Sequence, residues 1–387
     1  MRKIIIIMIL CMFWGNIAWA AATDAGPDLP VDLLESTSVN HINQFIQGIN
    51  KELTEEIPLL STETIKDIAA KGLTFNGQII ANKLLSYLFK EVATNIHLLG
   101  KLLFLAVLCA LLQNLQNSFE QSAISLLAYS VCFIFLSVIA LSAFYQGLTL
   151  ARETVGNMVG FMEALLPLML SLLAGVGALT SAALLTPLML LVVSVTSVIV
   201  KDIVLPLLFL TAVLECVNYL SGSYKLSNLT GVLKQAGMMT LGLVLVVFIG
   251  IVSIQGIAGS VADGLTLRTA KYATATFIPV VGKMFADTVE LVMGASLLLK
   301  NAVGIFGVLA ITLICALPLI KLISLVVVIK IAGALIQPMG DEKMAKCLDA
   351  MGNNLLLVFA ALLTVALMFF LVVTMIIGAG SVAMMLR

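Results

Sequence analysis

The stretch ALLPLMLSLLAGVGALTSAALLTPLMLLVVSVTSVIV, residues 164–200, contains no charged side chain. A helix of about 20 apolar residues is long enough to cross the hydrocarbon core of a bilayer, which is about 30 Å thick. Similar apolar runs recur as far as the C-terminus, at 98–115, 123–144, 203–220, 236–259, 302–336 and 355–384. Because no water-soluble domain needs several such runs, the sequence predicts an all-α, polytopic helical membrane protein.

The composition agrees with this class. Of the 387 residues, 61% are hydrophobic and 11% are charged, whereas about 25% are charged in ordinary globular domains. The 21 basic and 21 acidic side chains balance. No basic cluster with interleaved aromatic residues is present, so we expect no nucleic-acid partner.

Two of the apolar runs are too long for one crossing. The segment from Gly175 to Ser181, GVGALTS, is read as a turn inside 164–200, because glycines favour turns. Pro318 and Lys321 are expected to divide 302–336 in the same way. A total of seven to nine crossings follows.

The N-terminus has the pattern of a secretory signal peptide over residues 1–20. Arg2 and Lys3 precede a short apolar core, and Ala18 and Ala20 flank Trp19 as a small-x-small cleavage site. The alternative is an uncleaved first helix. Residues 21–95 then form an acidic, largely helical segment with ten carboxylates and five lysines. If the signal is cleaved, this segment is extracytoplasmic, as a docking module or as a solvated cap.

Four sequence pairs indicate a duplicated membrane unit. GLTL at 147–150 recurs at 264–267, and LPL at 205–207 recurs at 317–319. Pro167 pairs with Pro279, and LKQAG at 233–237 resembles LDAMG at 348–352. The offsets lie between 112 and 117 residues. We therefore expect a leading transmembrane pair at 96–144 and membrane repeats at 145–260 and 262–380.

Proline and charge mark the candidate functional positions within the membrane region. Each proline removes a backbone donor, so helices are expected to break at Pro167, Pro206, Pro279 and Pro318; transporters often bind substrate at such breaks. Ordinary packed membrane helices also tolerate proline. The candidate intramembrane or interfacial charges are Lys201, Asp202, Glu215, Lys321 and Lys330. The alternative reading of Lys201 and Asp202 is an interfacial turn with side chains that extend towards water.

Enzyme signatures are missing from the sequence. Its two histidines are His41 and His97, and it has no zinc-protease motif, nucleophile elbow or phosphate-binding loop. Cys109, Cys132, Cys216 and Cys315 lie in apolar runs as small core residues, and Cys347 stands alone in a polar segment. We expect no enzymatic activity, no cofactor and no metal, so ATP-driven work would come from a partner.

The chain resembles the stage III sporulation protein AE family. The resemblance is carried by FIPVVGKMFAD at 277–287, GASLLLKNAVG at 294–304, EALLP at 163–167 and the paired GLTL motifs. It implies a component of a channel or secretion-like complex made in the mother cell and placed in the outer forespore membrane. The implied partners are other membrane proteins of that complex, a separate ATPase and a ring-forming component. No catalytic residues are carried over. The remaining alternatives are a stand-alone secondary transporter and a non-transporting membrane scaffold.

Overall fold

The computed structural model describes residues 77–118, 123–220, 226–277, 281–339 and 341–385. Within these ranges the chain is helical and contains no strand, which confirms the all-α prediction. The predicted signal peptide, with Ala18 and Ala20 at its predicted cleavage site, lies outside the described residues. The elements are α4 (Gly77–Thr94), α5 (Ile96–Ser118), α6 (Ala123–Gly175), α7 (Leu179–Ile199), η2 (Val200–Val204), α8 (Leu205–Leu220), α9 (Ser227–Phe277), α10 (Val281–Ile336), η3 (Gln337–Met339) and α11 (Glu342–Met385).

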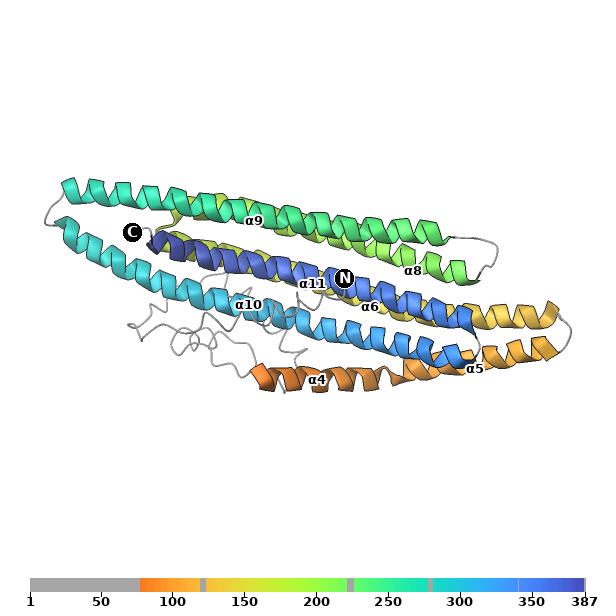
Figure 1. Ribbon diagram of the computed structural model, residues 1–387. Helices are drawn as coiled ribbons and strands as arrows, with labels where there is room; N and C mark the ends of the chain where they lie inside the picture. The colour runs from red at the N-terminus through yellow and green to blue at the C-terminus, as the bar shows by residue number, and fades with distance from the viewer. Residues whose placement is uncertain (1–76, 119–122, 221–225, 278–280, 340, 386–387) are drawn as a thin grey trace.

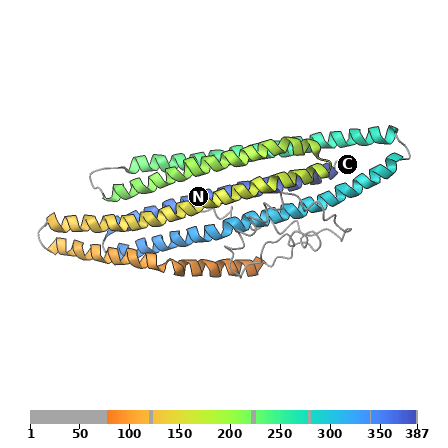
Figure 2. The same ribbon diagram turned by 180° about the vertical axis from the view of Figure 1, so that it is seen from behind.

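The helices run side by side as an elongated bundle, with successive long helices in opposite directions (Figures 1 and 2). Helix α11 packs against α6, α8, α9 and α10, and its contact with α10 is the most extensive in the bundle. Of the most apolar stretch of α11, 67% is buried inside the protein, whereas 22% of the corresponding stretch of α9 is buried. Helix α11 is therefore the central helix, and α9 lies at the edge.

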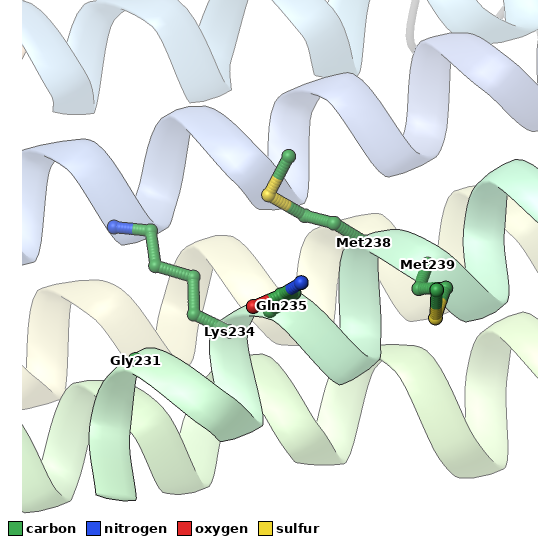
Figure 3. Close-up of a pocket in the computed structure, with 5 residues that line it drawn as sticks. All are labelled: Gly231, Lys234, Gln235, Met238 and Met239. Atoms are coloured by element: carbon green, nitrogen blue, oxygen red, sulfur yellow. The ribbon is translucent and has the colours of Figure 1, made fainter. Parts of the chain in front are cut away.

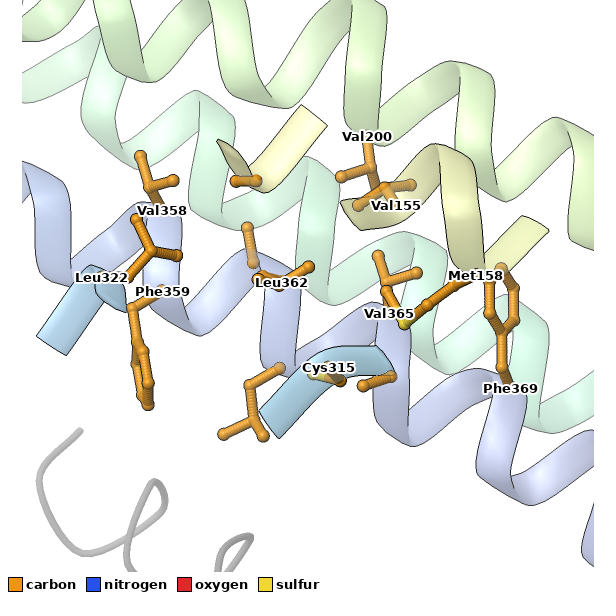
Figure 4. Packing of buried hydrophobic residues seen from close by; sticks show 14 of the residues in the cluster. Val155, Met158, Val200, Cys315, Leu322, Val358, Phe359, Leu362, Val365 and Phe369 are labelled. Carbon is orange, nitrogen blue, oxygen red and sulfur yellow. The ribbon is translucent and has the colours of Figure 1, made fainter. Parts of the chain in front are cut away.

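Apolar side chains from four chain segments form the core around α11. They include Val155 and Met158 of α6, Val200 of η2 and Cys315 of α10 (Figure 4). Helix α11 supplies a row with exposures of 6% or less, comprising Val358, Phe359, Leu362, Val365 and Phe369. These positions recur at intervals of mostly three and four residues, so one face of α11 contacts its neighbours along its length.

Five described helices are long and apolar enough to cross a membrane, or six with the pair α4–α5, which is bent by 42°. The expected number was seven to nine crossings, whereas five or six helices among the described residues meet this requirement of length and composition. The expected span 123–144 belongs to one helix that continues to Gly175. Helix α10 likewise continues through Pro318 and Lys321, so the predicted division of 302–336 was wrong.

Tertiary packing explains why Pro318 does not end α10. A proline in a helix leaves one carbonyl, four residues earlier, without its usual donor. Neighbouring helices stabilise such a helix when the surrounding side chains are tightly packed. Cys315 and Leu322 are fully buried and Leu317 is 5% exposed, so the proline lies in a tightly packed part of the bundle.

The predicted turn between Gly175 and Ser181 is confirmed. Helix α6 ends at Gly175 and α7 begins at Leu179. Gly177 has a φ of 93°, which only glycine adopts without steric cost. Its N–H donates to the carbonyl of Ala174 at 2.9 Å, and the N–H of Ala178 donates to that of Leu173 at 3.2 Å. These bonds satisfy carbonyls at the end of α6.

Side-chain caps set two further helix boundaries. Asp341 precedes α11, and its Oδ1 accepts hydrogen bonds from the N–H of Met344 at 3.0 Å and the hydroxyl of Tyr129 at 3.2 Å. This is the N-cap arrangement that satisfies a free donor of the first turn. At the α8–α9 connection, the Leu226 N–H donates to Asn218 Oδ1 at 2.8 Å. The connections between α10 and α11 and between α8 and α9 are thus each held by a specific polar contact.

The duplication stays a prediction. The expected boundary at 144/145 lies inside α6, and the boundary at 260/262 lies inside α9. The paired LPL motifs lie at the start of α8 and within α10. A duplicated unit would therefore consist of half of one long helix followed by a helical hairpin.

Substitution of Gly304 tests the packing of α10 against its neighbours. A Cβ atom there would meet Ile377 of α11 and lie 3.2 Å from the Met169 Cε atom of α6. We expect Gly304→Leu to lower the stability by about 1–3 kcal/mol through overpacking. Gly250→Leu on α9 is the matched control, because nothing lies within 4 Å of its Cβ position. Thermal unfolding in detergent measures both, and equal melting temperatures would contradict the packing.

Candidate functional site

An ion pair lies on the bundle surface, midway along an apolar helical path. Arg152 Nη2 of α6 lies 2.9 Å from Asp202 Oδ1 of η2, and the two side chains are 58% and 52% exposed. Asp202 is separated from both ends of the path, Leu179 and Leu220, by about 27 Å or more of helix. Charges so far inside an apolar segment are costly in lipid unless they are paired or hydrated. The pairing therefore reduces the cost of placing both there.

The backbone around Asp202 is a π-helical segment, η2, in which the Leu205 N–H donates to the carbonyl of Val200. Pro206 follows directly. Its ring would crowd the carbonyl of Asp202, four residues earlier, in an α-helix, and a wider turn avoids this. Lys201 and Asp202 thus lie in a continuous helical path and not in a turn between two spans. Single π turns inside helices are frequent at functional sites.

A polar pocket of about 460 Å³ lies where α4, α6 and α10 meet. The bend between α4 and α5 adjoins it, at Asn95, whose amide donates to the carbonyl of Glu91 at 3.0 Å and to Ser324 Oγ of α10 at 3.2 Å. The bend is thereby attached to α10. The pocket is lined by Glu91, Asn95, Tyr145, Gln146, Thr149, Leu150, Glu153, Lys321 and Leu325.

Three charges face this pocket without neutralising one another. Among the described residues, the side chains of Glu91, Glu153 and Lys321 form no ion pair within 4.0 Å and no hydrogen bond. Charged groups in a largely apolar bundle need water or a ligand. The pocket is therefore suited to hold water or a polar ligand. Glu153 follows Arg152 on α6, so the pocket and the η2 ion pair lie at the same level of the bundle.

A second polar cluster lies near the end of the bundle where α8 ends and α11 begins. Glu215 Oε2 accepts a 2.6 Å hydrogen bond from the Asn354 amide. Lys330 Nζ donates to Asp349 Oδ1 and Asn353 Oδ1, each at 2.9 Å. These contacts connect α11 to α8 on one side and to α10 on the other.

A shallow pocket on α9 is formed by Gly231, Lys234, Gln235, Met238 and Met239 (Figure 3). Lys234 also interacts electrostatically with Glu215. Because one helix supplies all five lining residues, this pocket offers one cation and no converging set of polar groups.

The structure does not bring the five predicted charges together. Lys201 and Asp202 lie at η2, Lys321 lies in the polar pocket, and Glu215 and Lys330 belong to the cluster at the bundle end.

The predicted proline breaks also differ in outcome. Helices α6 and α10 continue through Pro167 and Pro318, while Pro206 follows the π turn. Pro279 lies outside the described residues. A functional role for these prolines stays a prediction.

Several polar positions were not among the sequence-predicted site residues. Lys300 is 0% exposed and donates to the carbonyl of Ile377 at 2.8 Å. Arg152 and Asn354 were also missed, and no sequence pattern distinguishes them, because their partners are 50 and 139 residues away.

One prediction about cysteine was wrong. Cys347 does not stand alone in a polar segment: it is buried in α11, 3.6 Å from the Sγ atom of Cys216. Over the described ranges, no group of three or more histidine, cysteine or carboxylate side chains could hold a metal ion.

Two substitutions at Glu215 test the buried hydrogen bond to Asn354. Glu215→Gln keeps an oxygen acceptor for the amide of Asn354, which is 0% exposed, so we expect a small change in melting temperature. Glu215→Leu removes the acceptor and should cost about 1–3 kcal/mol, the penalty of a buried unpaired polar group. Thermal unfolding in detergent compares the two variants. Equal losses would indicate that the hydrogen bond contributes little.

Comparison with known proteins gives a consistent result. The sequence profile of the family described as stage III sporulation protein AE matches residues 60–380. Stage III sporulation protein AE of Bacillus subtilis (strain 168) is 40% identical over 352 residues, covering 91% of this chain and 88% of the relative. No solved structure matches the chain. The family is named for a stage of sporulation and not for a reaction. The chain is thus a multi-pass helical protein that belongs to the stage III sporulation protein AE family.

Proposed function

We propose that this protein is a multi-pass membrane component of a sporulation channel or secretion-like complex that connects mother cell and forespore. It would lie in the outer forespore membrane and be required for forespore development. Membership of the family supports the role in sporulation. The length of the apolar helices supports assembly with other proteins.

The apolar helices are about twice as long as a bilayer requires. The described helical segment from Met293 to Met339, which comprises most of α10 and η3, spans 47 residues, or about 70 Å of helix, whereas the hydrocarbon core is about 30 Å thick. Transmembrane helices tilt by at most about 40°, and at that angle this segment still spans about 54 Å. Part of this helix therefore lies outside the hydrocarbon core, and the apolar side chains exposed there require a cover other than lipid.

Exposed side chains show where such a cover is needed. Large apolar side chains that are 39–64% exposed recur along α7 and α8 from Leu179 to Leu220, a surface about 60 Å long. A bilayer covers about half of it. Apolar patches left in water mark interfaces with other proteins. Other subunits of one complex would cover the remainder, which favours the complex over a stand-alone protein.

The partners of the proposed complex follow from the family resemblance and from the chemistry of the chain. The sequence has no phosphate-binding loop, so a separate ATPase would supply the energy. A ring-forming component would extend the conduit between the two membranes. Other membrane proteins of the complex would cover the exposed apolar helices.

A stand-alone secondary transporter is the second candidate. The polar pocket and the η2 ion pair favour it, because transporters place polar groups where helices are irregular. A membrane scaffold without transport of its own is the third. Cross-linking to partner proteins distinguishes the complex from a stand-alone transporter, and neutral substitutions test for an ion-coupled transporter.

Photo-cross-linking in sporulating cells tests the complex. A photoreactive amino acid at Leu184 and another at Val217, which are 51% and 40% exposed, lie about 50 Å apart along the helix. Both cannot lie within one hydrocarbon core. We expect at least one of them to cross-link to another protein, and the ATPase and the ring-forming component to co-purify.

The matched control places the same probe at Leu185, which is 1% exposed. This position should give cross-links within the chain alone. If Leu184 and Val217 both react with lipid and with no protein, and no partner co-purifies, the proposed complex is wrong.

Neutral substitutions separate the complex from an ion-coupled transporter. We expect Asp202→Asn, Glu215→Gln and Lys321→Met each to preserve spore yield to within about threefold. Asp202 is 52% exposed in its ion pair, and exposed ion pairs contribute little stability. Glutamine at 215 keeps an acceptor for Asn354, and Lys321 forms no ion pair among the described residues. The measurement is the count of heat-resistant spores, with protein abundance checked by immunoblot. A loss of about 100-fold or more at normal abundance, in any one variant, would favour an ion path through that residue.

A further inference from the structure

Three sulfur atoms meet where α8 packs against α11. The Sγ atom of Cys216 lies 3.6 Å from Sγ of Cys347 and 3.3 Å from Sδ of Met351. Cys347 and Met351 are four residues apart, so both lie on the same face of α11. The three side chains are 0–7% exposed. Two helices thus supply a compact group of sulfur ligands.

We propose that Cys216, Cys347 and Met351 bind a monovalent copper ion. Thiolate and thioether sulfur are the ligands that select Cu(I) over harder cations. Zinc prefers four nitrogen, oxygen or thiolate ligands, and in the described part of the chain no third histidine, cysteine or carboxylate completes such a set. The donor set therefore distinguishes copper from zinc.

The spacing of the sulfur atoms is compatible with an ion at their centre. Metal–thiolate bonds are about 2.3 Å long, so three sulfurs around one ion lie about 4 Å apart. The observed contacts of 3.3 and 3.6 Å are about 0.7 and 0.4 Å shorter. The unbranched methionine side chain adjusts over such distances. Small rotations of the side chains would open the site.

The site is close to a solvated end of the bundle. Cys216 lies four residues before the end of α8, and Cys347 lies five residues after the start of α11. Each is within about 8 Å of its helix end. Lys346 and Glu342 on the first turns of α11 are 58% and 74% exposed. An ion could therefore enter from water without crossing the apolar core.

Binding involves no change of oxidation state. The two thiols of Cys216 and Cys347 release two protons to the solvent, and the thioether of Met351 coordinates as a neutral ligand. One monovalent cation replaces two protons, so the cluster gains one negative charge. Affinity should accordingly increase with pH.

Competition with a Cu(I) chelator tests the site in the full chain, purified in detergent without oxygen and with a reductant. We expect one tight equivalent of Cu(I). Cys216→Ser and Cys347→Ser should each weaken binding by about 100-fold or more, and Met351→Leu by about tenfold, since it keeps the volume and removes one ligand. X-ray absorption should find three sulfur neighbours in the parent and two in the methionine variant.

Cys315→Ser is the matched control, because Cys315 is a buried cysteine of α10 outside the cluster. It should bind Cu(I) as the parent does. The proposal fails if the parent binds no Cu(I) more tightly than Cys347→Ser, if Cys315→Ser loses as much affinity, or if Zn²⁺ displaces the copper at equal concentration. Melting temperatures of all variants identify any that are misfolded, and Met351→Leu remains informative if a serine variant does not fold.

Discussion

The need to satisfy every backbone polar group without water is the constraint on which this structure depends. In hydrocarbon, a helix meets this need within its own segment. The chain therefore continues as helix through Pro167 and Pro318 and widens into a π turn before Pro206. Glycine interrupts it where the chain must reverse, at Gly177. Helices of 44–56 residues result, and they are longer than a bilayer is thick.

The same constraint locates the polar chemistry. Because the backbone hydrogen bonds are formed within each helix, the polar contacts between helices are made by side chains. These side chains lie at two levels of the bundle. One level holds the η2 ion pair and the pocket around Lys321. The other holds Glu215, Lys330 and the sulfur atoms where α8 meets α11. Along α7 and α8, large apolar side chains are exposed between and beyond these levels, which is why assembly with other proteins is the simplest account of this surface.

Sequence reasoning identified residues but not their partners. The charges at Lys201, Asp202 and Lys321 were found because an ionisable group stands out in an apolar run. Arg152 and Asn354 were not found, because each becomes significant only through a residue on another helix. Cys347 was misjudged for the same reason: its local sequence is polar, whereas its surroundings in the fold are apolar.

The sequence by itself determined that the chain is a helical membrane protein, that it turns at Gly177, and to which family it belongs. Hydropathy, the position of a glycine and the spacing of motifs are local properties of a sequence. Tertiary structure decided the continuity of α6 and α10 and the composition of each polar cluster. Whether a proline ends a helix depends on the free energy of packing around it, which local sequence does not contain. Which side chains meet likewise depends on how helices align, over separations of more than 100 residues.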